Sequence, residues 1–229
     1  MFWQEDEDKT LPWQAPDDIL DVSFAINCRQ LPQDHNWALS EAIREYLPWI
    51  GKDRSSGVHS IHVAGDANGW LRPEDNSDQL LIPSKRTRMM LRIPKKRLPD
   101  TLELAGKTLD IDGYSIAVGK GKEKPFLNAS VIFARYVLSA PNEAEDSFLQ
   151  RMADEIKVVA DFKVKKMMCG KSHYLSTPNG SQFTRHLMIA DLENDPSIRL
   201  QQYGLGAGRE FGCGLFLPHK GIKTLKPTE

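Results

Sequence analysis

The stretch that decides how this chain folds is Gly204-Leu-Gly-Ala-Gly-Arg-Glu-Phe-Gly-Cys-Gly-Leu-Phe216, which runs directly into Leu217-Pro-His-Lys220. Five glycines sit here among apolar residues. A residue without Cβ adopts positive φ at little cost and lets another backbone or a phosphate come close. A flexible linker is the alternative, but linkers are rich in serine and other polar residues, whereas Leu205, Phe211 and Phe216 suit a loop anchored in a core. The pattern therefore favours a binding loop.

Two common glycine-rich nucleotide motifs do not fit this stretch. A dinucleotide fingerprint follows a strand near the start of a βαβ unit, whereas this run comes late in the sequence. A P-loop needs Gly-Lys-Ser/Thr after its first glycine, and the stretch has no such tripeptide. The spacing that does occur is Gly-x-Gly, five residues, Gly-x-Gly, formed by Gly204, Gly206, Gly212 and Gly214. It resembles the C-terminal glycine-rich signature of the RAMP proteins of CRISPR systems.

The resemblance extends to further motifs, which stand in family order. They are Leu31-Pro-Gln-Asp-His35, Leu47-Pro-Trp49, Gly57-Val-His59, Leu91-Arg-Ile-Pro94, Ser197-Ile-Arg-Leu-Gln-Gln-Tyr-Gly-Leu-Gly206 and Gly212-Cys-Gly-Leu-Phe-Leu-Pro-His-Lys220. From about residue 19 to 223 the chain resembles the myxobacterial-type variant of the endoribonuclease that cuts the CRISPR repeat transcript into guide RNAs. The resemblance implies an α+β fold of two tandem ferredoxin-like, RRM-like domains, with RNA held across both and a glycine-rich loop at 204–214.

Periodicity along the chain also indicates two copies of a βαββαβ unit. In the first copy we expect strands at 21–29, 58–63, 79–82, 89–93, 108–111 and 114–118, a helix from about Asp34 with a stripe at Leu39, Ile43 and Leu47, and a weak helix at 95–104. In the second copy we expect a strand at 129–139, a helix from about Asp146, a strand at 183–192 and a last helix from Pro196. The predicted domains are therefore 19–125 and 126–229, preceded by an arm at 1–18.

Composition limits the class of protein. The 229 residues are 40% hydrophobic and 27% charged, which is enough for two small cores. No apolar stretch is long enough to cross a membrane, and the N-terminus carries acids where a secretory signal needs lysines. Cys28, Cys169 and Cys213 stand far apart, without the Cys-x-x-Cys spacing of a zinc ribbon. We expect a cytoplasmic protein with no metal, no cofactor and no membrane partner.

The net charge of -1 hides an uneven distribution. Residues 1–18 hold six acids and one lysine, so the remainder carries an excess of four positive charges. The densest basic block, 85–97, has seven basic residues and no acid. Met89, Leu91 and Ile93 alternate there with Arg88, Met90 and Arg92, which predicts a strand with one apolar and one partly basic face. A plain solvated surface is the alternative to an RNA-binding face.

The residues that we expect to bind RNA lie in this block and in the C-terminal motif. They are Lys85, Arg86, Arg88, Arg92, Gly204, Gly206, Gly208, Arg209, Gly212, Gly214, His219 and Lys220. For Arg209 a phosphate contact is expected because loop amides and a guanidinium together form an anion site, and a salt bridge to Glu210 or another neighbour is the alternative. Lys163, Lys165, Lys166 and Lys171 provide a second basic patch.

Six histidines are the candidates for proton transfer near neutral pH. His35 is expected in the first helical turn, where the helix dipole disfavours the imidazolium, although it could equally be a helix cap. His59 follows Gly57 in the connection from helix to strand, where the family commonly carries its active histidine. We expect His35 and His59 to be the catalytic pair, with the roles of base and acid unassigned, and His62, His173 and His186 to be structural.

The resemblance implies metal-independent cleavage in which the 2′-hydroxyl attacks the adjacent phosphate, giving a 2′,3′-cyclic phosphate and a 5′-hydroxyl. A base must remove the 2′ proton and an acid must protonate the departing 5′ oxygen. CRISPR repeat RNA, its crRNA product and other CRISPR effector-complex subunits are the expected partners. Two alternatives are a non-catalytic RAMP scaffold subunit and a general RNA-recognition module, but the latter lacks a run of exposed aromatics for base stacking.

Overall fold

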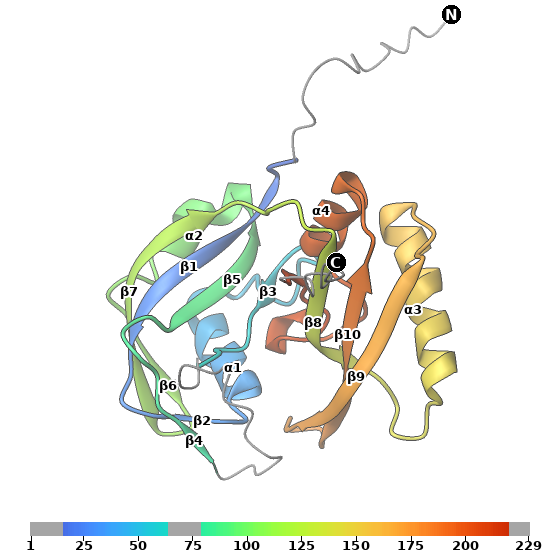
Figure 1. Ribbon diagram of the computed structural model, residues 1–229. Coiled ribbons are helices and arrows are strands. Elements are labelled where there is room, and N and C mark those ends of the chain that lie inside the picture. The colour runs from blue at the N-terminus through green and yellow to red at the C-terminus, as the bar shows by residue number, and fades with distance from the viewer. Residues whose placement is uncertain (1–15, 64–78, 220–229) are drawn as a thin grey trace, which may run out of the picture.

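The computed structural model describes residues 16–63 and 79–219, and it is a mixed α/β protein built on two antiparallel sheets. In Figure 1 the two sheets stand side by side, and the segment at 125–130 crosses from one to the other. The arm predicted at 1–18 falls almost wholly outside the described residues, and Lys220 also lies outside them.

The first sheet has the strand order β3-β5-β1-β7-β6. Its strands are β1 (Ile19–Asn27), β3 (Gly57–Val58), β5 (Arg88–Pro94), β6 (Thr108–Ile111) and β7 (Tyr114–Lys124). The accompanying helices are α1 (Asn36–Tyr46), the 3-10 turn η1 (Lys95–Arg97) and α2 (Leu98–Leu102), and β2 (Leu31–Pro32) pairs with β4 (Leu80–Leu81) in a separate short ladder. The strand predicted at 58–63 is shorter than expected, and β7 continues six residues beyond the predicted 118.

The second sheet has the order β11-β8-β10-β9. Its elements are β8 (Val131–Leu138), α3 (Glu145–Ala160), β9 (Lys166–Leu175), β10 (Gln182–Ala190), α4 (Asn194–Tyr203), the 3-10 turn η2 (Arg209–Phe211) and β11 (Leu217–Pro218). The strand β9 was not predicted, because its lysines suggested only a basic surface patch. In Figure 1 it forms the outer edge of the sheet, and α3 lies beside it.

Alternating side chains on the central strands form the first core. Val22 on β1 faces Leu91 on β5 in the ladder, and both side chains are fully buried. Leu39 and Ile43 lie on one face of α1 and belong to the same apolar cluster. Each such side chain contributes about 1.5–3 kcal/mol by leaving water. The predicted strand and helix stripes are therefore confirmed at these positions.

A smaller cluster joins the two sheets. Phe211 and Cys213, from the glycine-rich stretch, pack with Leu175 of β9 and with Trp37 of α1. The rings of Trp37 and Phe211 lie 5.7 Å apart, and the Asn36 side-chain amide donates a hydrogen bond of 2.9 Å to the Phe211 carbonyl. The glycine-rich stretch is thus a packed loop between the sheets.

Close backbone packing explains the first and last glycines of this loop. The Leu205 amide donates to the Gly214 carbonyl at 3.1 Å, and the Gly214 amide donates to the Tyr136 carbonyl at 2.6 Å. Gly214 has φ +66°, and a Cβ there would collide with the Leu205 carbonyl oxygen. A Cβ on Gly204 would collide in the same way with the Gly214 carbonyl oxygen. These two positions therefore require glycine because the two ends of the loop touch.

We predict that Gly214→Ala destabilises the protein by more than about 3 kcal/mol, because the backbone of Leu205 must move away. Gly206→Ala is the matched control, since Gly206 has φ +70° but a Cβ there meets nothing within 4 Å. Its cost is about 1–2 kcal/mol, from the left-handed conformation alone. Urea unfolding of the two variants measures the difference, and equal losses would contradict the packing argument.

Candidate functional site

A buried ion pair lies on the face of the first sheet opposite its apolar core. Asp21 on β1 and Arg92 on β5 are direct partners in the ladder, and the guanidinium meets the carboxylate with two bonds, Nε to Oδ1 at 2.9 Å and Nη2 to Oδ2 at 3.1 Å. Arg92 Nη2 also donates to the Phe216 carbonyl at 3.0 Å, and the guanidinium lies 4.9 Å from the centre of the Phe126 ring. The ion pair therefore ties the first sheet to the glycine-rich stretch.

The expectation that Arg92 belongs to an exposed basic face was wrong. Its exposed fraction is 0%, so it is an interior cation. The alternation along β5 correctly separated the two faces, but the second face is covered at this position by the segment that contains Phe216. An arginine this deep needs a carboxylate and a carbonyl as partners, and it has both.

His59 lies beside this ion pair. Its Nε2 is 3.4 Å from Asp21 Oδ1, its side chain is buried, and its backbone amide donates to the Met90 carbonyl at 3.0 Å. Burial lowers the pKa of His59 from its ordinary value, and the Asp21 carboxylate opposes that change only in part. Among the described residues, no partner is recorded for the other ring nitrogen, Nδ1. A neutral imidazole held by a carboxylate on one side is thus available for a hydrogen bond on the other.

The carboxyl group of Asp21 stays ionised over the physiological range. Burial by itself raises its pKa, but the Arg92 guanidinium and the His59 ring outweigh burial and hold the pKa well below its ordinary value. The stability that this pair contributes is therefore present above pH 4, where an unfolded aspartate is ionised, and is lost only in strong acid.

His35 is held differently, because both of its ring nitrogens meet backbone groups. The Ile61 amide donates to Nε2 at 2.9 Å, so the ring proton must be on Nδ1, which donates to the Pro32 carbonyl at 2.8 Å. His35 occupies the N-cap position of α1, but its ring makes no capping hydrogen bond. Burial lowers its pKa, so the ring is neutral as expected, though desolvation and not the helix dipole is the main cause. This geometry fits a structural role.

The three other predicted cations of the basic block are exposed. Lys85, Arg86 and Arg88 lie at the start of β5 and in the turn before it, and Arg88 Nη1 donates to the Lys85 carbonyl at 2.9 Å. Two lysines that the sequence analysis missed, Lys122 and Lys124, are exposed on β7, opposite Ser23 and Asp21 of β1. Their period-two spacing in Lys120-Gly-Lys122-Glu-Lys124 was the available signal.

The glycine-rich loop turns most of its predicted RNA-binding positions toward the protein. The amide of Gly206 already meets an anion, donating to Glu155 Oε1 at 2.6 Å. Arg209 donates to the Tyr203 carbonyl, and no ion pair is recorded for it among residues 16–63 and 79–219. Partial burial lowers the pKa of the Arg209 guanidinium. His219 is exposed at the end of β11, with its ring 5.9 Å from the ring of Phe133.

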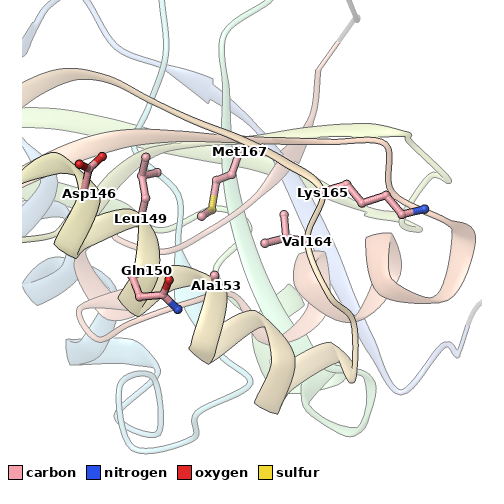
Figure 2. Close-up of a pocket in the computed structure, with 7 residues that line it drawn as sticks. All are labelled: Asp146, Leu149, Gln150, Ala153, Val164, Lys165 and Met167. Carbon is pink, nitrogen blue, oxygen red and sulfur yellow. The ribbon is translucent and has the colours of Figure 1, made fainter.

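A shallow pocket with a volume of about 380 Å³ lies elsewhere, between α3 and the start of β9. Figure 2 shows Leu149, Val164 and Met167 in its lining, with Asp146 and Lys165 at its edges. It has no histidine in its lining and lies on the side of β9 that carries α3. The described part of the chain contains no cluster of metal-binding side chains, and none of its helices could span a bilayer.

Burial of neutral histidines predicts a pH dependence of stability. The pKa values of His35, His59 and His62 are all lowered from 6.5, mainly by burial, and that of His62 most strongly. The unfolded chain then binds more protons than the folded one as pH falls below 6.5, so stability is lost with falling pH. We expect the free energy of unfolding to decrease from pH 7.5 to pH 5.0, by up to about 1.4 kcal/mol per pH unit for each histidine.

In the variant His62→Gln the unfolding free energy should depend less steeply on pH. The difference should correspond to the loss of at most one proton taken up per molecule on unfolding, as measured by urea unfolding at a series of pH values. A slope equal to that of the unchanged protein would show that His62 is protonated in the folded state.

Comparisons with known proteins agree with this architecture. The family model described as Cas6 Crispr matches residues 20–221. The CRISPR-associated endonuclease Cas6 of Myxococcus xanthus (strain DK1622) is 27% identical over 203 residues, covering 87% of this chain and 81% of that protein.

Solved structures support the same fold at lower sequence identity. A RAMP protein described as binding different RNA substrates superposes with a TM-score of 0.60 at 13% identity, over 86% of this chain and 98% of that one. A structure described as CRISPR associated protein Cas6 gives a TM-score of 0.57 at 10% identity, over 88% and 100%. The family model covers most of the chain, and the chain therefore belongs to the Cas6 family of CRISPR-associated proteins.

Proposed function

We propose that this chain is a metal-independent endoribonuclease that cleaves CRISPR repeat RNA, the pre-crRNA, into crRNA. Membership of the Cas6 family and the relative named as an endonuclease support the reaction class. We further propose that the chain consists of an acidic arm at 1–18 and two ferredoxin-like domains at 19–125 and 126–229. The sheet orders support the domains, because in both sheets the first strand of the unit lies between the third and the last.

The observation that carries the mechanism is the hydrogen-bonded group of Asp21, Arg92 and His59. In the proposed reaction a base takes the 2′-hydroxyl proton, the 2′ oxygen bonds to phosphorus, and the bond from phosphorus to the 5′ oxygen breaks as that oxygen gains a proton. His59 is our candidate for proton transfer, because the Asp21 carboxylate holds its ring at Nε2 and burial keeps it neutral near pH 7. Arg92 positions Asp21 and is not proposed as a contact to RNA.

The hydrogen bonds of the two histidines support His59 over His35 as the residue that transfers the proton. Both nitrogens of His35 are engaged by backbone groups, so it would have to break a hydrogen bond before it could move a proton. We propose that His35 positions the segment from Ser60 to Ile61, next to His59, through its bond from the Ile61 amide. His59 then carries the proton transfer, and the partner acid or base is left open.

We propose that RNA lies along the exposed cations of the first sheet and reaches the glycine-rich loop. Lys85, Arg86 and Arg88 provide one end of this path, and Lys122 and Lys124 extend it across β7. Arg209 and His219 are the candidates near the loop. Retention of the product crRNA, together with other CRISPR effector-complex subunits, is part of the proposal.

One observation favours a second candidate function, that of a non-catalytic RNA-binding RAMP subunit. His35 and His59 are only 1% and 4% exposed, so RNA cannot approach either ring closely without a local rearrangement. A scaffold subunit would use the same exposed cations and would not need these rings.

We predict a single cut in repeat RNA from the organism's own CRISPR array, in excess EDTA, that is blocked by one 2′-deoxy substitution. His59→Ala should slow single-turnover cleavage at least about 100-fold, the usual loss for a general acid or base, while RNA affinity is retained. His35→Asn is the comparison, because the asparagine amide can still donate to the Pro32 carbonyl, and it should lose much less activity. Tight binding by the unchanged protein without any cut would support the scaffold function.

We also predict that the triple variant Lys85→Gln, Arg86→Gln and Arg88→Gln binds repeat RNA more weakly at low salt. The slope of log affinity against log salt should fall by about two for single-stranded RNA, at about 0.7 for each lost phosphate contact. The matched control changes three exposed lysines on other elements to glutamine, namely Lys52, Lys107 and Lys157. An equal loss in both triple variants would indicate a general charge effect and no defined path.

A further inference from the structure

Asn36, the first residue of α1, is buried and joins two segments that are distant from each other in the sequence. The residue is 2% exposed. Its Nδ2 group donates a hydrogen bond to the Phe211 carbonyl at 2.9 Å, and its Oδ1 atom accepts one from the Ser60 hydroxyl at 2.9 Å. A carbonyl oxygen can only accept, so the amide nitrogen must be the atom that faces Phe211. The side chain therefore bridges the glycine-rich loop and the residue that follows His59.

The place of Asn36 in the helix makes this use of its side chain informative. An asparagine near the start of a helix usually accepts a hydrogen bond from a backbone amide of the first turn. Here Oδ1 accepts a hydroxyl from another segment instead. A side-chain amide loses free energy on burial unless its polar atoms are hydrogen-bonded. The two bonds to distant segments therefore explain why an asparagine is stable at this buried position.

The glycine-rich loop packs directly against β3 and the segment after it. A Cβ on Gly212 would lie 2.8 Å from Asn36 Nδ2 and 3.4 Å from the Ser60 amide nitrogen. A Cβ on Gly57 would lie 2.8 Å from Leu215 Cδ2. Each glycine lets its own backbone come close to the opposite segment. The position of the loop therefore determines the space available to the segment after β3.

His59 is linked to the glycine-rich stretch on two sides. One link runs from its ring through the buried ion pair to the Phe216 carbonyl. The other runs from the next residue along the chain through Asn36 to the Phe211 carbonyl. The backbone amide of His59 is held separately by the Met90 carbonyl on β5. Asn36 thus supplies the link that reaches the backbone beside His59 from the loop.

We propose that Asn36 is a positioning residue that places His59 according to the position of the glycine-rich loop. Asn36 acts through Ser60 and does not itself touch RNA. His35 bonds the same segment to the Pro32 carbonyl and not to the loop. A displacement of a reacting group by about 1 Å can slow a reaction about 100-fold. The inference rests on the proposed function in taking His59 as the group that transfers the proton, but the place of its ring can be measured without cleavage.

Two small substitutions break the bridge at different ends. Asn36→Asp keeps the shape and the acceptor for the Ser60 hydroxyl, but it places a carboxylate oxygen against the Phe211 carbonyl. Ser60→Ala removes the other bond, and Ser60→Thr restores a hydroxyl as the conservative rescue. Ser197→Ala is the matched control, because the buried Ser197 hydroxyl also joins two segments, by donating to the Ala129 carbonyl at 2.7 Å, but it lies on α4.

The first readout is the NMR signal of the His59 ring in the full chain with isotope-labelled histidine, assigned with His59→Gln. We expect this signal to shift in Asn36→Asp and in Ser60→Ala and to return in Ser60→Thr, whereas Ser197→Ala should leave it unchanged. The second readout is single-turnover cleavage of repeat RNA. Both bridge variants should cleave about 10- to 100-fold more slowly. Their affinity for repeat RNA that is 2′-deoxy at the scissile nucleotide should stay the same, and Ser60→Thr should regain most of the rate.

If the unchanged protein cuts RNA and Ser60→Ala loses no more rate than Ser197→Ala, the positioning role is wrong and the nuclease function stands. A loss of RNA affinity as large as the loss of rate would also overturn the role, because the bridge would then serve binding. If the unchanged protein binds RNA without cutting it, the nuclease function is wrong. The ring signal then decides, since an unshifted His59 signal in Ser60→Ala would contradict the bridge. Urea unfolding of each variant identifies losses that come from instability.

Discussion

The ion pair between Asp21 and Arg92 is the constraint on which the arrangement around His59 depends. Two charges taken out of water are stable only when each is fully hydrogen-bonded, and removing one partner of such a pair costs about 3–5 kcal/mol. Arg92 meets this need in large part, through two hydrogen bonds to Asp21 and one to the Phe216 carbonyl, which belongs to the other end of the chain, whereas its Nη1 is buried without a hydrogen-bond partner among the described residues. The pair therefore fixes β1, β5 and the glycine-rich stretch together, and Asp21 holds His59 at their meeting point.

Burial has opposite consequences for the two groups of histidines. His35 and His59 are shielded from water, which keeps their rings neutral and gives them defined partners, but it also hides them from a large substrate. His173 and His186 are half-buried and share a hydrogen bond of 2.9 Å between their Nε2 atoms. Burial thus gives the first pair a defined protonation state, whereas the second pair is more accessible to solvent.

The periodicity of apolar residues within each segment predicted the core-facing sides of the strands and helices. It did not predict which parts of the chain cover the opposite side of the first sheet. Val22, Leu91 and Ile43 could be assigned to the core because alternation and helical spacing are properties of single segments. Arg92 could not, because its burial depends on Phe216, which is distant in sequence. The edge strand β9 was missed for two reasons. Its exposed lysines indicated only a basic surface patch, and a bulge at Gly170 and Lys171 breaks the alternation of buried and exposed residues that would have predicted a strand. The pair of His173 and His186 depends on that missed strand.

The glycine signature has a physical explanation that does not require a ligand. Gly204 and Gly214 permit the two ends of the loop to touch, and the loop presses Phe211 against Trp37 of α1. A motif that closes a loop between two sheets would mark the family whatever each member does with RNA. Sequence resemblance built on these glycines therefore indicates the fold first, whereas the reacting groups proposed for this chain, His59 with its partner Asp21, lie outside the glycine motif and have to be argued from their own contacts.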